Sequence, residues 1–547
     1  MRPQRYTDEM VKEYLDKGYW TKTTYADLFE RNAKEYAQKE AFVDDSGNKF
    51  TWAEANQAVN RLALKLVELG YNKDDTLMIQ LPNRVEIILM RVACEKAGII
   101  SIPVVRTLRH DEIGYILKLA ETKGYVGLWK FRDFDYWQMI QELRPGLPAL
   151  KNIFFCGDEI PEGGISIKEV LATPMEKKYS VDDLKKRQVQ VDEVAWIELS
   201  TGTTGFPKVI QTPMALATSV SPSHMAKIKM TGDDVACAFA PISGAGRGLA
   251  RFTPFVAAKG VLMEHFDAED AFKLIEKEKI SIPMVVPAQL AMMLQSTNYT
   301  KYDLRSLRVF QVAGAPLPPH IAEEVETRFK CLVVNHYGGM DAGSLTSVSA
   351  DDPVEVRRFS VGKPHPGNEI RLLDDNGKEV KHGEVGAVYF KGPTSVGGYY
   401  KDPAMTKEAW GANGFNMGDL AKFDEQGNLY IVGRKKDIII RGGFNVYPAE
   451  VEAILVTHPK VEAAAVVGYP DPIMGERACA YVVVKKGETF TFEEMGAYFK
   501  ERKINLNKTP ERLEIIEKMP LVADMKLDKK VLKEDILNKI KSEGKAS

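Results

Sequence analysis

Apolar residues recur along the chain in two different patterns. In YADLFERNAKEYAQKEAFV and TWAEANQAVNRLALKLVELG they stand three and four positions apart, which is typical of amphipathic helices. Short apolar runs, namely DTLMIQLP, GIISIPVV, YVGLW and NIFFCG, are separated by helix-length segments and predict buried strands. Helices and strands that alternate in this way predict parallel α/β units.

A polar stretch, EKKYSVDDLKKRQVQVDE, interrupts this alternation and predicts a boundary near residue 185. The alternation resumes at VAWIEL and continues through SIPMVV, LRVFQVAG and CLVVNHYG. We therefore expect one α/β subdomain over residues 1–185 and a second over residues 186–355.

The pattern of apolar and polar residues changes again in the last third of the chain. Over residues 356–433 short strand-like runs alternate with turn signals such as DNG, which predicts a small β-barrel or sheet. After GRKKD, helix and strand patterns return and predict a compact α+β domain over residues 438–547, joined through residues 434–437. The predicted fold class is multidomain α/β, with a large N-terminal region of two α/β subdomains plus a β-barrel, and a small mobile α+β C-terminal domain.

Composition narrows the possible partners. The 547 residues carry 74 Lys and Arg against 76 Asp and Glu, and a net charge of -2 gives no field that would favour nucleic acid or an anionic membrane. No apolar segment is long enough to span a bilayer, and no secretory signal follows the N-terminal arginines. The five cysteines are scattered, so we interpret them as reduced core residues of a cytoplasmic protein that binds a small molecule. The oligomeric state stays open.

One glycine-rich stretch, STGTTGFPK, is a candidate phosphate loop. It is no Walker motif, because the lysine does not directly follow the last glycine and no hydroxyl follows the lysine. Its glycines would let backbone N–H groups face an anion, its hydroxyls add donors, and its lysine adds a point charge. Taken alone, such a stretch is more often a plain strand-to-helix turn. The residues concerned are Thr201, Gly202, Thr203, Thr204, Gly205 and Lys208.

Further motifs decide between these interpretations. VAGAPLP, NHYGGMD, MGDLAKFDEQGNLYIVGRKKDIIIRGG and PLVADMK follow STGTTGFPK in that order over more than 300 residues. Together they resemble the acyl-adenylate-forming superfamily, which includes acyl-CoA synthetases, aryl-acid ligases, adenylation domains and firefly luciferase. The N-terminal half looks closest to the branch with dihydroxybenzoate and alicyclic-acid ligases.

The resemblance implies an ATP site. Tyr337 is similar to the aromatic residue that stacks on adenine, and Asp419 to the carboxylate that accepts bonds from both ribose hydroxyls, with Arg434 as a second ribose and phosphate contact. The residues implied to line the nucleotide also include Gly314, Ala315, Pro316, Asn335, His336, Gly338, Gly339 and Met340. Met340 stands where the family has a threonine, so one donor to the α-phosphate is lost. Asp341 replaces a glutamate that serves Mg²⁺, directly or through water.

The resemblance also gives roles to the C-terminal domain. Lys526 in PLVADMK is similar to the catalytic lysine, although Met525 precedes it where a glycine is common. Lys436 matches the hinge position about which the small domain rotates. Gly442 and Gly443 would border a tunnel for the pantetheine of coenzyme A.

The acyl pocket is expected near APISGAGRG and the helix around SPSHM. The small residues Gly244, Ala245 and Gly246 would leave room for a bulky or cyclic acid. Arg247 and Arg251 could be structural or could lie near the phosphates of coenzyme A, and the sequence does not choose.

The resemblance thus implies an AMP-forming acid–CoA ligase that uses ATP, Mg²⁺ and coenzyme A on an aromatic or alicyclic acid. Three alternatives stay open. An aryl-acid AMP ligase would load a carrier protein in place of coenzyme A. A luciferase-like enzyme would consume oxygen, and a non-catalytic protein would only bind nucleotide.

Overall fold

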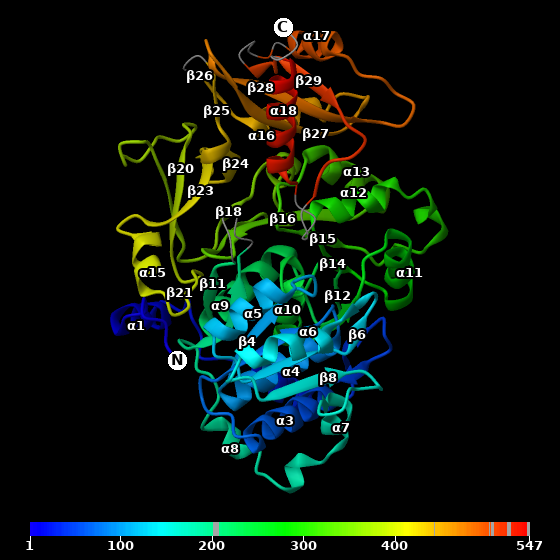
Figure 1. The fold of residues 1–547 in the computed structure, drawn as a ribbon, viewed down its shortest axis with the longest axis vertical. Coiled ribbons are helices and arrows are strands. Elements are labelled where there is room, and N and C mark those ends of the chain that lie inside the picture. Colours follow the sequence, from blue (N-terminus) through cyan, green and yellow to red (C-terminus); the bar gives the residue numbers. More distant parts are fainter. Residues whose placement is uncertain (201–206, 442–443, 503, 505–507, 522–526, 544–547) are drawn as a thin grey trace.

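The computed structural model describes residues 1–200, 207–441, 444–502, 504, 508–521 and 527–543. Figure 1 shows a large N-terminal region and, above it in the view, a small C-terminal unit in orange and red. The mixed α/β fold class with these two parts is confirmed. The part of the chain that the structure describes does not include residues 201–206, 442–443, 503, 505–507, 522–526 and 544–547.

Helices cover both faces of two large sheets. In the N-terminal half they are α1 (Asp8–Asp16), α2 (Tyr25–Glu35), α3 (Trp52–Glu68), α4 (Val85–Ala97), α5 (His110–Leu119), α6 (Tyr136–Leu143), α7 (Ile167–Ala172) and α8 (Asp182–Lys185). They continue with α9 (Met214–Ile228), α10 (Gly248–Val256), α11 (Ala268–Glu278), α12 (Pro287–Gln295), α13 (Pro319–Phe329), α14 (Val354–Phe359) and α15 (Pro403–Ala409).

The first sheet has eight strands. In spatial order they are β21 (Gly398–Tyr399), β11 (Val209–Pro213), β10 (Val194–Leu199), β4 (Ile100–Val104), β3 (Thr76–Gln80), β5 (Gly124–Leu128), β8 (Asn152–Cys156) and β9 (Ile165–Ser166). The strands β3, β4 and β5 are parallel and buried at every position. This explains why they read as continuous apolar runs in the sequence.

The second sheet has nine strands. In spatial order they are β18 (Lys363–Pro364), β17 (Gly343–Ser347), β16 (Leu332–Gly339), β15 (Val309–Val312), β14 (Ile282–Val285), β12 (Val235–Ala238), β13 (Lys259–Leu262), β1 (Glu40–Asp44) and β2 (Lys49–Thr51). Its centre is parallel, and β17 and β18 add an antiparallel edge.

The two sheets exchange strands across the boundary predicted near residue 185. β1 and β2 come from the first stretch of sequence but extend the nine-stranded sheet, while β10 and β11 come from the second stretch but complete the eight-stranded sheet. The polar segment before residue 186 therefore separates two stretches of sequence and does not separate the two sheets.

Helix α4 joins the two sheets in one core. Every residue of α4 except Arg91 is buried, and its apolar side chains belong to a cluster that includes residues of both β3 and β12. The neighbouring α3 begins with a capping box, in which Thr51 and Glu54 satisfy each other's backbone N–H groups.

A third sheet fills the stretch for which a small barrel or sheet is predicted. It is antiparallel, with the order β19 (Glu369–Leu373), β20 (Gly386–Lys391), β23 (Gly414–Phe423) and β22 (Trp410–Gly411), and β24 (Leu429–Arg434) pairs with β23. A separate hairpin links β6 (Lys130–Phe131) and β7 (Phe134–Asp135).

In its described residues, the C-terminal unit has a mixed sheet and three α-helices. Its strands are β26 (Phe444–Val446), β25 (Ile439–Arg441), β28 (Gly475–Val484), β27 (Val461–Asp471) and β29 (Arg512–Ile515). Its helices are α16 (Pro448–Leu455), α17 (Phe492–Glu501) and α18 (Lys529–Glu543). α18 buries Leu532 and Ile536 against the sheet.

Candidate active site

The residues predicted to hold adenine and ribose meet where β16 approaches β23. The Tyr337 hydroxyl donates to Asp419 Oδ2 over 2.6 Å, and Arg434 Nε lies 2.9 Å from Asp419 Oδ1. Asp419 and Arg434 face each other in the register of β23 and β24. Since an ionised carboxylate has about four lone-pair sites, Asp419 keeps acceptor capacity for two ribose hydroxyls.

Burial and charge oppose each other at Asp419. Its burial raises the pKa of the carboxyl group, Arg434 and the Tyr337 hydroxyl lower it, and the balance is a raised pKa. The side chain of Asp419 is 8% exposed, whereas that of Arg434 is 55% exposed and so partly screened by water. The carboxylate is therefore short of compensating donors in the absence of a ligand.

The predicted adenine wall follows β15. Gly314 has a φ of +92°, a conformation that glycine adopts without strain. A Cβ there would lie 3.7 Å from Ala245 Cβ, so the bend that contains Gly314, Ala315 and Pro316 lies beside the small-residue segment predicted for the acyl pocket. The adenine wall and the predicted acyl pocket are thus neighbours.

Gly338 and Gly339 differ in how much space there would be for a Cβ atom. A Cβ at Gly338 would lie 2.4 Å from the backbone oxygen of Gly343, so the glycine is required by the pairing of β16 with β17. At Gly339 the nearest atom to a Cβ would be Met417 Cε at 3.3 Å. Close approach between strands accounts for the first glycine without any ligand.

The predicted phosphate and magnesium residues also come together. Lys208 Nζ lies 3.4 Å from Asp341 Oδ2 and 3.2 Å from the hydroxyl of Tyr399, which in turn lies 3.3 Å from Asp341. Burial lowers the pKa of Lys208, but the bonds to Tyr399 and Asp341 outweigh it, and the pKa is raised. Lys208 is therefore a cation at neutral pH.

The predicted loop residues Thr201 to Gly205 lie outside the described residues, but their flanks are placed. β10 and β11 are antiparallel partners, and the backbone N–H of Ser200 donates to the carbonyl of Lys208 over 3.1 Å. The stretch thus connects two strands of a hairpin. The alternative of a strand-to-helix turn is wrong, because α9 begins only after β11.

Tyr399 is a residue of this site that the sequence analysis missed. It lies on β21, which pairs with β11 and so places the tyrosine ring under the Lys208 ammonium group at 5.1 Å. The two residues are 191 positions apart. The adjacent glycines of VGGYYKD were the one local signal for a close backbone approach.

An oxygen-seeking ion would fit beside Asp341. Its carboxylate is the hard ligand type that Mg²⁺ prefers, and the Lys208 ammonium beside it would share the charge of bound phosphates. Met340 packs with Ile210, Leu216 and Val396, and its Sδ lies 2.7 Å from Arg247 Nη1.

The small residues of the predicted acyl pocket form a tight turn. Ala245–Arg247 is a single 3-10 turn, and a Cβ at Gly246 would lie 2.1 Å from the carbonyl oxygen of Ala240. At Gly244 the nearest atom to a Cβ would be the carbonyl oxygen of Pro241, at 3.6 Å. Gly246 is thus required by the backbone, while Gly244 leaves space.

Arg247 and Arg251 bind one buried carboxylate, a cluster that the sequence analysis missed. Arg247 Nη1 lies 3.1 Å from Glu198 Oε2 and Arg251 Nη2 lies 3.0 Å from Glu198 Oε1. Thr212 and the Trp196 indole also donate to this carboxylate. We call Glu198, Arg247 and Arg251 the arginine cluster.

The arginine cluster holds Glu198 ionised. Burial raises the pKa of Glu198, but the attraction of Arg247, Arg251 and Arg91 outweighs it, and the pKa is lowered. Burial, with repulsion from Arg247, lowers the pKa of Arg251 to about 10. Arg251 therefore pairs with a buried carboxylate. Of the two roles that the sequence left open for Arg251, a structural role or a contact with coenzyme A phosphates, this pairing supports the structural one.

Asn335 and His336 lie on β16 beside Tyr337. The Asn335 side-chain oxygen accepts from the backbone N–H of His336 over 3.0 Å, and the His336 ring lies 2.8 Å from the Ser344 hydroxyl. Because side chains alternate along a strand, His336 and Tyr337 point to opposite faces of β16.

The predicted hinge lies between two sheets. Lys436 is exposed in the 3-10 turn Lys435–Asp437, which follows β24 and precedes β25. Lys435 in the same turn pairs with Asp375 over 2.7 Å. The predicted residues Gly442, Gly443 and Lys526 lie outside the described residues.

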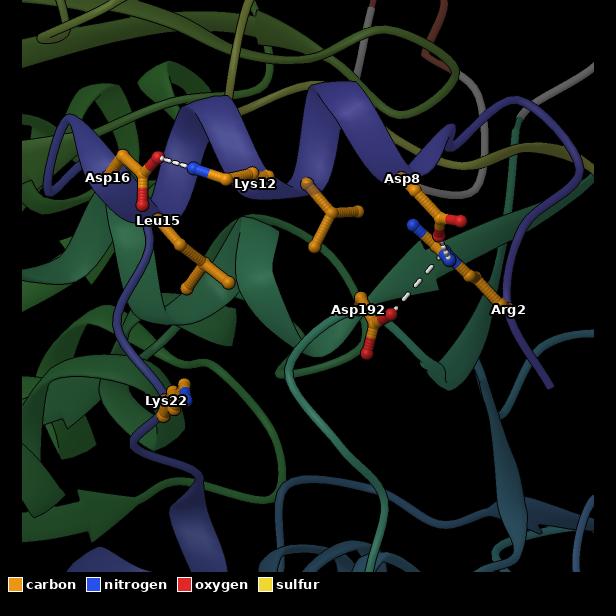
Figure 2. Close-up of a pocket in the computed structure, with 8 residues that line it drawn as sticks. Arg2, Asp8, Lys12, Leu15, Asp16, Lys22 and Asp192 are labelled. Carbon is orange, nitrogen blue, oxygen red and sulfur yellow. Dashed lines mark hydrogen bonds and ion pairs between the residues drawn. The ribbon is translucent and has the colours of Figure 1, made fainter.

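A charged surface cavity lies far along the sequence from these residues. Figure 2 shows Arg2 between Asp8 and Asp192, with Lys12 paired to Asp16 on the same helix. The cavity measures about 340 Å³, and none of the predicted site residues lines it. Apart from Lys22, its charged residues are paired with one another, so we interpret it as a solvated depression.

Two further expectations can be compared with the structure. All five cysteines are free and buried, as predicted for core thiols. Within the described ranges, none of the helices has the length and apolar character that a membrane crossing requires.

Comparison with known proteins gives a consistent family. The family model described as AMP-binding enzyme matches residues 29–400, and that described as AMP-binding enzyme C-terminal domain matches residues 450–526. The 2,3-dihydroxybenzoate-AMP ligase of Bacillus subtilis (strain 168) is 30% identical over 98% of this chain and 98% of its own length. The medium-chain fatty-acid–CoA ligase of Escherichia coli (strain K12) is 29% identical over 98% of this chain and 94% of its own.

Solved structures agree with this result. The ATP-bound structure of MatB from Rhodopseudomonas palustris matches with a TM-score of 0.81 and 28% identity, and the match covers 94% of this chain and 99% of that one.

Proposed function

Because the chain belongs to the family of AMP-binding enzymes, we propose that it joins a carboxylic acid to the thiol of coenzyme A in two steps. In the first step a carboxylate oxygen attacks the α-phosphorus of ATP, and pyrophosphate leaves. In the second the thiol attacks the acyl carbon, its proton is released, and AMP leaves. The observation that carries the proposal is that Tyr337, Asp419 and Arg434 contact one another, while Asp341, which follows Tyr337 in the same motif, pairs with Lys208.

Each group would have a defined task. Asp419 fixes the ribose through its unused lone pairs, and the Tyr337 ring, held by its hydroxyl, offers a flat face to the base. Lys208 attracts the phosphates that depart as pyrophosphate. Mg²⁺ beside Asp341 would neutralise phosphate charge. We assign Lys526 to the charge that develops at the α-phosphate in the transition state.

The acid we propose is aromatic or alicyclic. Gly244 leaves space beside the adenine wall, and relatives of this chain include a 2,3-dihydroxybenzoate-AMP ligase and a 2-hydroxy-7-methoxy-5-methyl-1-naphthoate–CoA ligase from Streptomyces carzinostaticus. An apolar pocket would supply affinity for such rings. The second candidate function is an aryl-acid AMP ligase that loads a carrier protein, favoured by the identity to the dihydroxybenzoate enzyme.

We also propose that residues 434–437 are a hinge between the two parts of the chain. The exposed turn at Lys436 is the link between β24 and β25, so a change of φ and ψ there re-aims the whole C-terminal unit. Proline would fix φ. Lys436→Pro should therefore lose thioester formation from pre-formed acyl-AMP more than acyl-AMP synthesis, and equal losses in single-turnover assays would place the hinge elsewhere.

The decisive experiment is a panel of acids with ATP and Mg²⁺. We expect pyrophosphate release with benzoate or cyclohexanecarboxylate ahead of acetate and palmitate, and an acyl-CoA when coenzyme A is added. Lys526→Ala is the control, expected to bind ATP and to release little pyrophosphate. Acyl-AMP without any thioester on free coenzyme A would favour the carrier-protein function. ATP binding without pyrophosphate release for every acid would refute both.

A further inference from the structure

The side chains of three histidines from distant parts of the chain lie close together, and one of the three belongs to β16. His224 lies on α9, His336 on β16 and His365 just after β18, and one ring nitrogen of each lies within 4.8 Å of the others. The ring centroids of His224 and His336 are 5.2 Å apart, and those of His336 and His365 are 5.7 Å apart. We call these three residues the histidine triad.

A neutral partner holds each ring of the histidine triad by one nitrogen. His224 Nε2 lies 3.0 Å from Gln311 Oε1, His336 Nε2 lies 2.8 Å from the Ser344 hydroxyl, and His365 Nδ1 lies 3.1 Å from the Ser223 hydroxyl. Hydrogen bonds of this kind orient the imidazoles of metal sites and leave the other nitrogen for the ion.

The remaining nitrogens have no partner. Within the part of the chain that the structure describes, His224 Nδ1, His336 Nδ1 and His365 Nε2 are buried and form no hydrogen bond. His224 is 2% exposed and His365 is 1% exposed. Since buried polar atoms are nearly always satisfied, one unsatisfied nitrogen on each of three adjacent rings calls for a ligand.

The electrostatic state of the rings suits a metal ion. Burial lowers the pKa of His224 to about 4 and also lowers the pKa of His336 and His365 far below the ordinary value. All three rings are therefore neutral at physiological pH, which is the form that ligates metals.

We propose that His224, His336 and His365 form a binding site for a divalent transition-metal ion, with zinc as the best-fitting ion. Three imidazoles plus one open position are a common zinc set, and Zn–N bonds of about 2.0–2.1 Å put the nitrogens of a tetrahedral site roughly 3.3 Å apart. The separation of up to 4.8 Å would thus contract by up to about 1.5 Å on binding, which ring rotations about χ1 and χ2 supply.

The charges near the histidine triad do not exclude a cation. The nearest basic groups are Lys227 and Arg247. Arg247 is paired with Glu198, and burial lowers the pKa of Lys227 to about 8, so this lysine can lose its proton when an ion binds. Lys227 donates to two backbone carbonyls, those of Ser347 and Lys363, and these bonds keep it turned toward the backbone.

An ion could reach the site through a cavity. His365 and Ser223 line a cavity of about 240 Å³ together with Thr218, Pro222 and Thr394. Its wall is built mainly by α9 and by the segment after β18, the two elements that supply His224 and His365. The proposal does not depend on the identity of the acid, since metal binding is measured without substrate.

The test measures zinc on the full-length protein. After treatment with a chelator and dialysis against ZnSO₄, we expect about one equivalent of zinc per chain, and visible d–d bands with Co²⁺ in its place. His224→Gln and His365→Gln should weaken zinc binding more than about 100-fold, because they remove ligands, and Ser223→Ala about 10-fold, because it releases the His365 ring.

The exposed His382 supplies the control. His382→Gln should bind zinc as the unaltered protein does. Circular dichroism tells misfolded variants apart, and if a ligand variant fails to fold, Ser223→Ala and the anomalous zinc signal in crystals of the unaltered protein decide. The proposal is overturned if the unaltered protein retains no zinc, or if the ligand variants bind it equally. It is also overturned if these variants change only the Michaelis constant for the acid, since the rings would then serve a polar acyl group.

Discussion

Two buried carboxylates, Asp419 and Glu198, both bind arginine, and yet their pKa values move in opposite directions. On β23, Asp419 has one arginine partner that is 55% exposed, and burial raises its pKa. On β10, Glu198 has two partners, Arg247 and Arg251, that are 20% and 5% exposed, and its pKa is lowered.

The difference separates a binding group from a structural one. Residues of the chain itself compensate the charge of the Glu198 carboxylate. The nearby arginines lower its pKa by more than burial raises it. Asp419 is undersatisfied, so hydroxyl donors from a ligand would stabilise it further. If this comparison holds, substitution of Glu198 should cost folding stability and substitution of Asp419 should cost ligand affinity.

Glu198→Gln should give the largest effect. The amide leaves Arg247 and Arg251 without a counter-charge in the interior, and breaking a buried ion pair typically costs about 3–5 kcal/mol. We expect a loss of this order in the free energy of unfolding, measured by urea denaturation with tryptophan fluorescence, since Trp196 lies beside Glu198.

A surface pair provides the control for Glu198→Gln. Glu121 pairs with Lys401 but is 75% exposed, so Glu121→Gln should leave the free energy of unfolding nearly unchanged. Equal losses for the two glutamates would break the comparison, because Glu198 would then be no more than a surface charge.

Asp419→Asn comes next in size. It removes the charge that the ribose hydroxyls would bind, and hydrogen bonds to a charged group contribute about 1.5–3 kcal/mol. We expect the dissociation constant of ATP to rise about 10- to 100-fold, measured by calorimetry without the acid. Asp424→Asn, in the turn between β23 and β24, is the matched control. Unchanged ATP affinity in the Asp419 variant would remove Asp419 from the site.

Tyr337→Phe should give a smaller loss in the same assay. The variant keeps the ring that we propose stacks on adenine and loses only the hydroxyl that donates to Asp419 over 2.6 Å. We expect ATP affinity to fall about 3- to 10-fold, because one hydrogen bond is lost while a half-exposed arginine remains. Tyr430→Phe, whose hydroxyl donates to Asp424, should have no effect on ATP. A loss as large as that of Asp419→Asn would mean that the hydroxyl itself contacts the nucleotide.

The sequence predicts where the strands of this fold lie better than it predicts which strands pair with one another. β3, β4, β5, β10, β14 and β15 coincide with apolar runs, because strands buried on both faces consist mainly of apolar residues. β16 is apolar and buried only near its start, at Val333 and Val334. β1 was missed, since its residues continue a helical spacing. That β1 pairs with β13, more than 200 positions later, follows from packing and cannot be read from local pattern.

The candidate site likewise contains residues that the sequence predicts and residues that it does not predict. Tyr337, Asp419 and Arg434 stand in motifs, and the structure brings them together, although their roles remain predictions. Glu198 carries no local signal and Tyr399 only that of its adjacent glycines, because the role of each depends on a partner far along the chain: Arg251 is 53 positions from Glu198. His224 and His365 are likewise solitary in the sequence and meet only through the packing of α9 against β17 and β18.

The smallest effect is a difference in slope with pH. A lowered folded-state pKa means that Glu198 contributes stability above its unfolded pKa of about 4.3 and loses it as the pH falls through the folded value. The deficit of Glu198→Gln should therefore shrink as the pH falls from 6 toward 3. Asp419 has a raised folded-state pKa, so its ionisation costs stability as the pH rises from its unfolded value of about 3.9. Without nucleotide, Asp419→Asn should become more stable relative to the unaltered protein over that rise. Urea midpoints at a series of pH values measure both slopes, and slopes of the same sign would show that the two carboxylates share one environment.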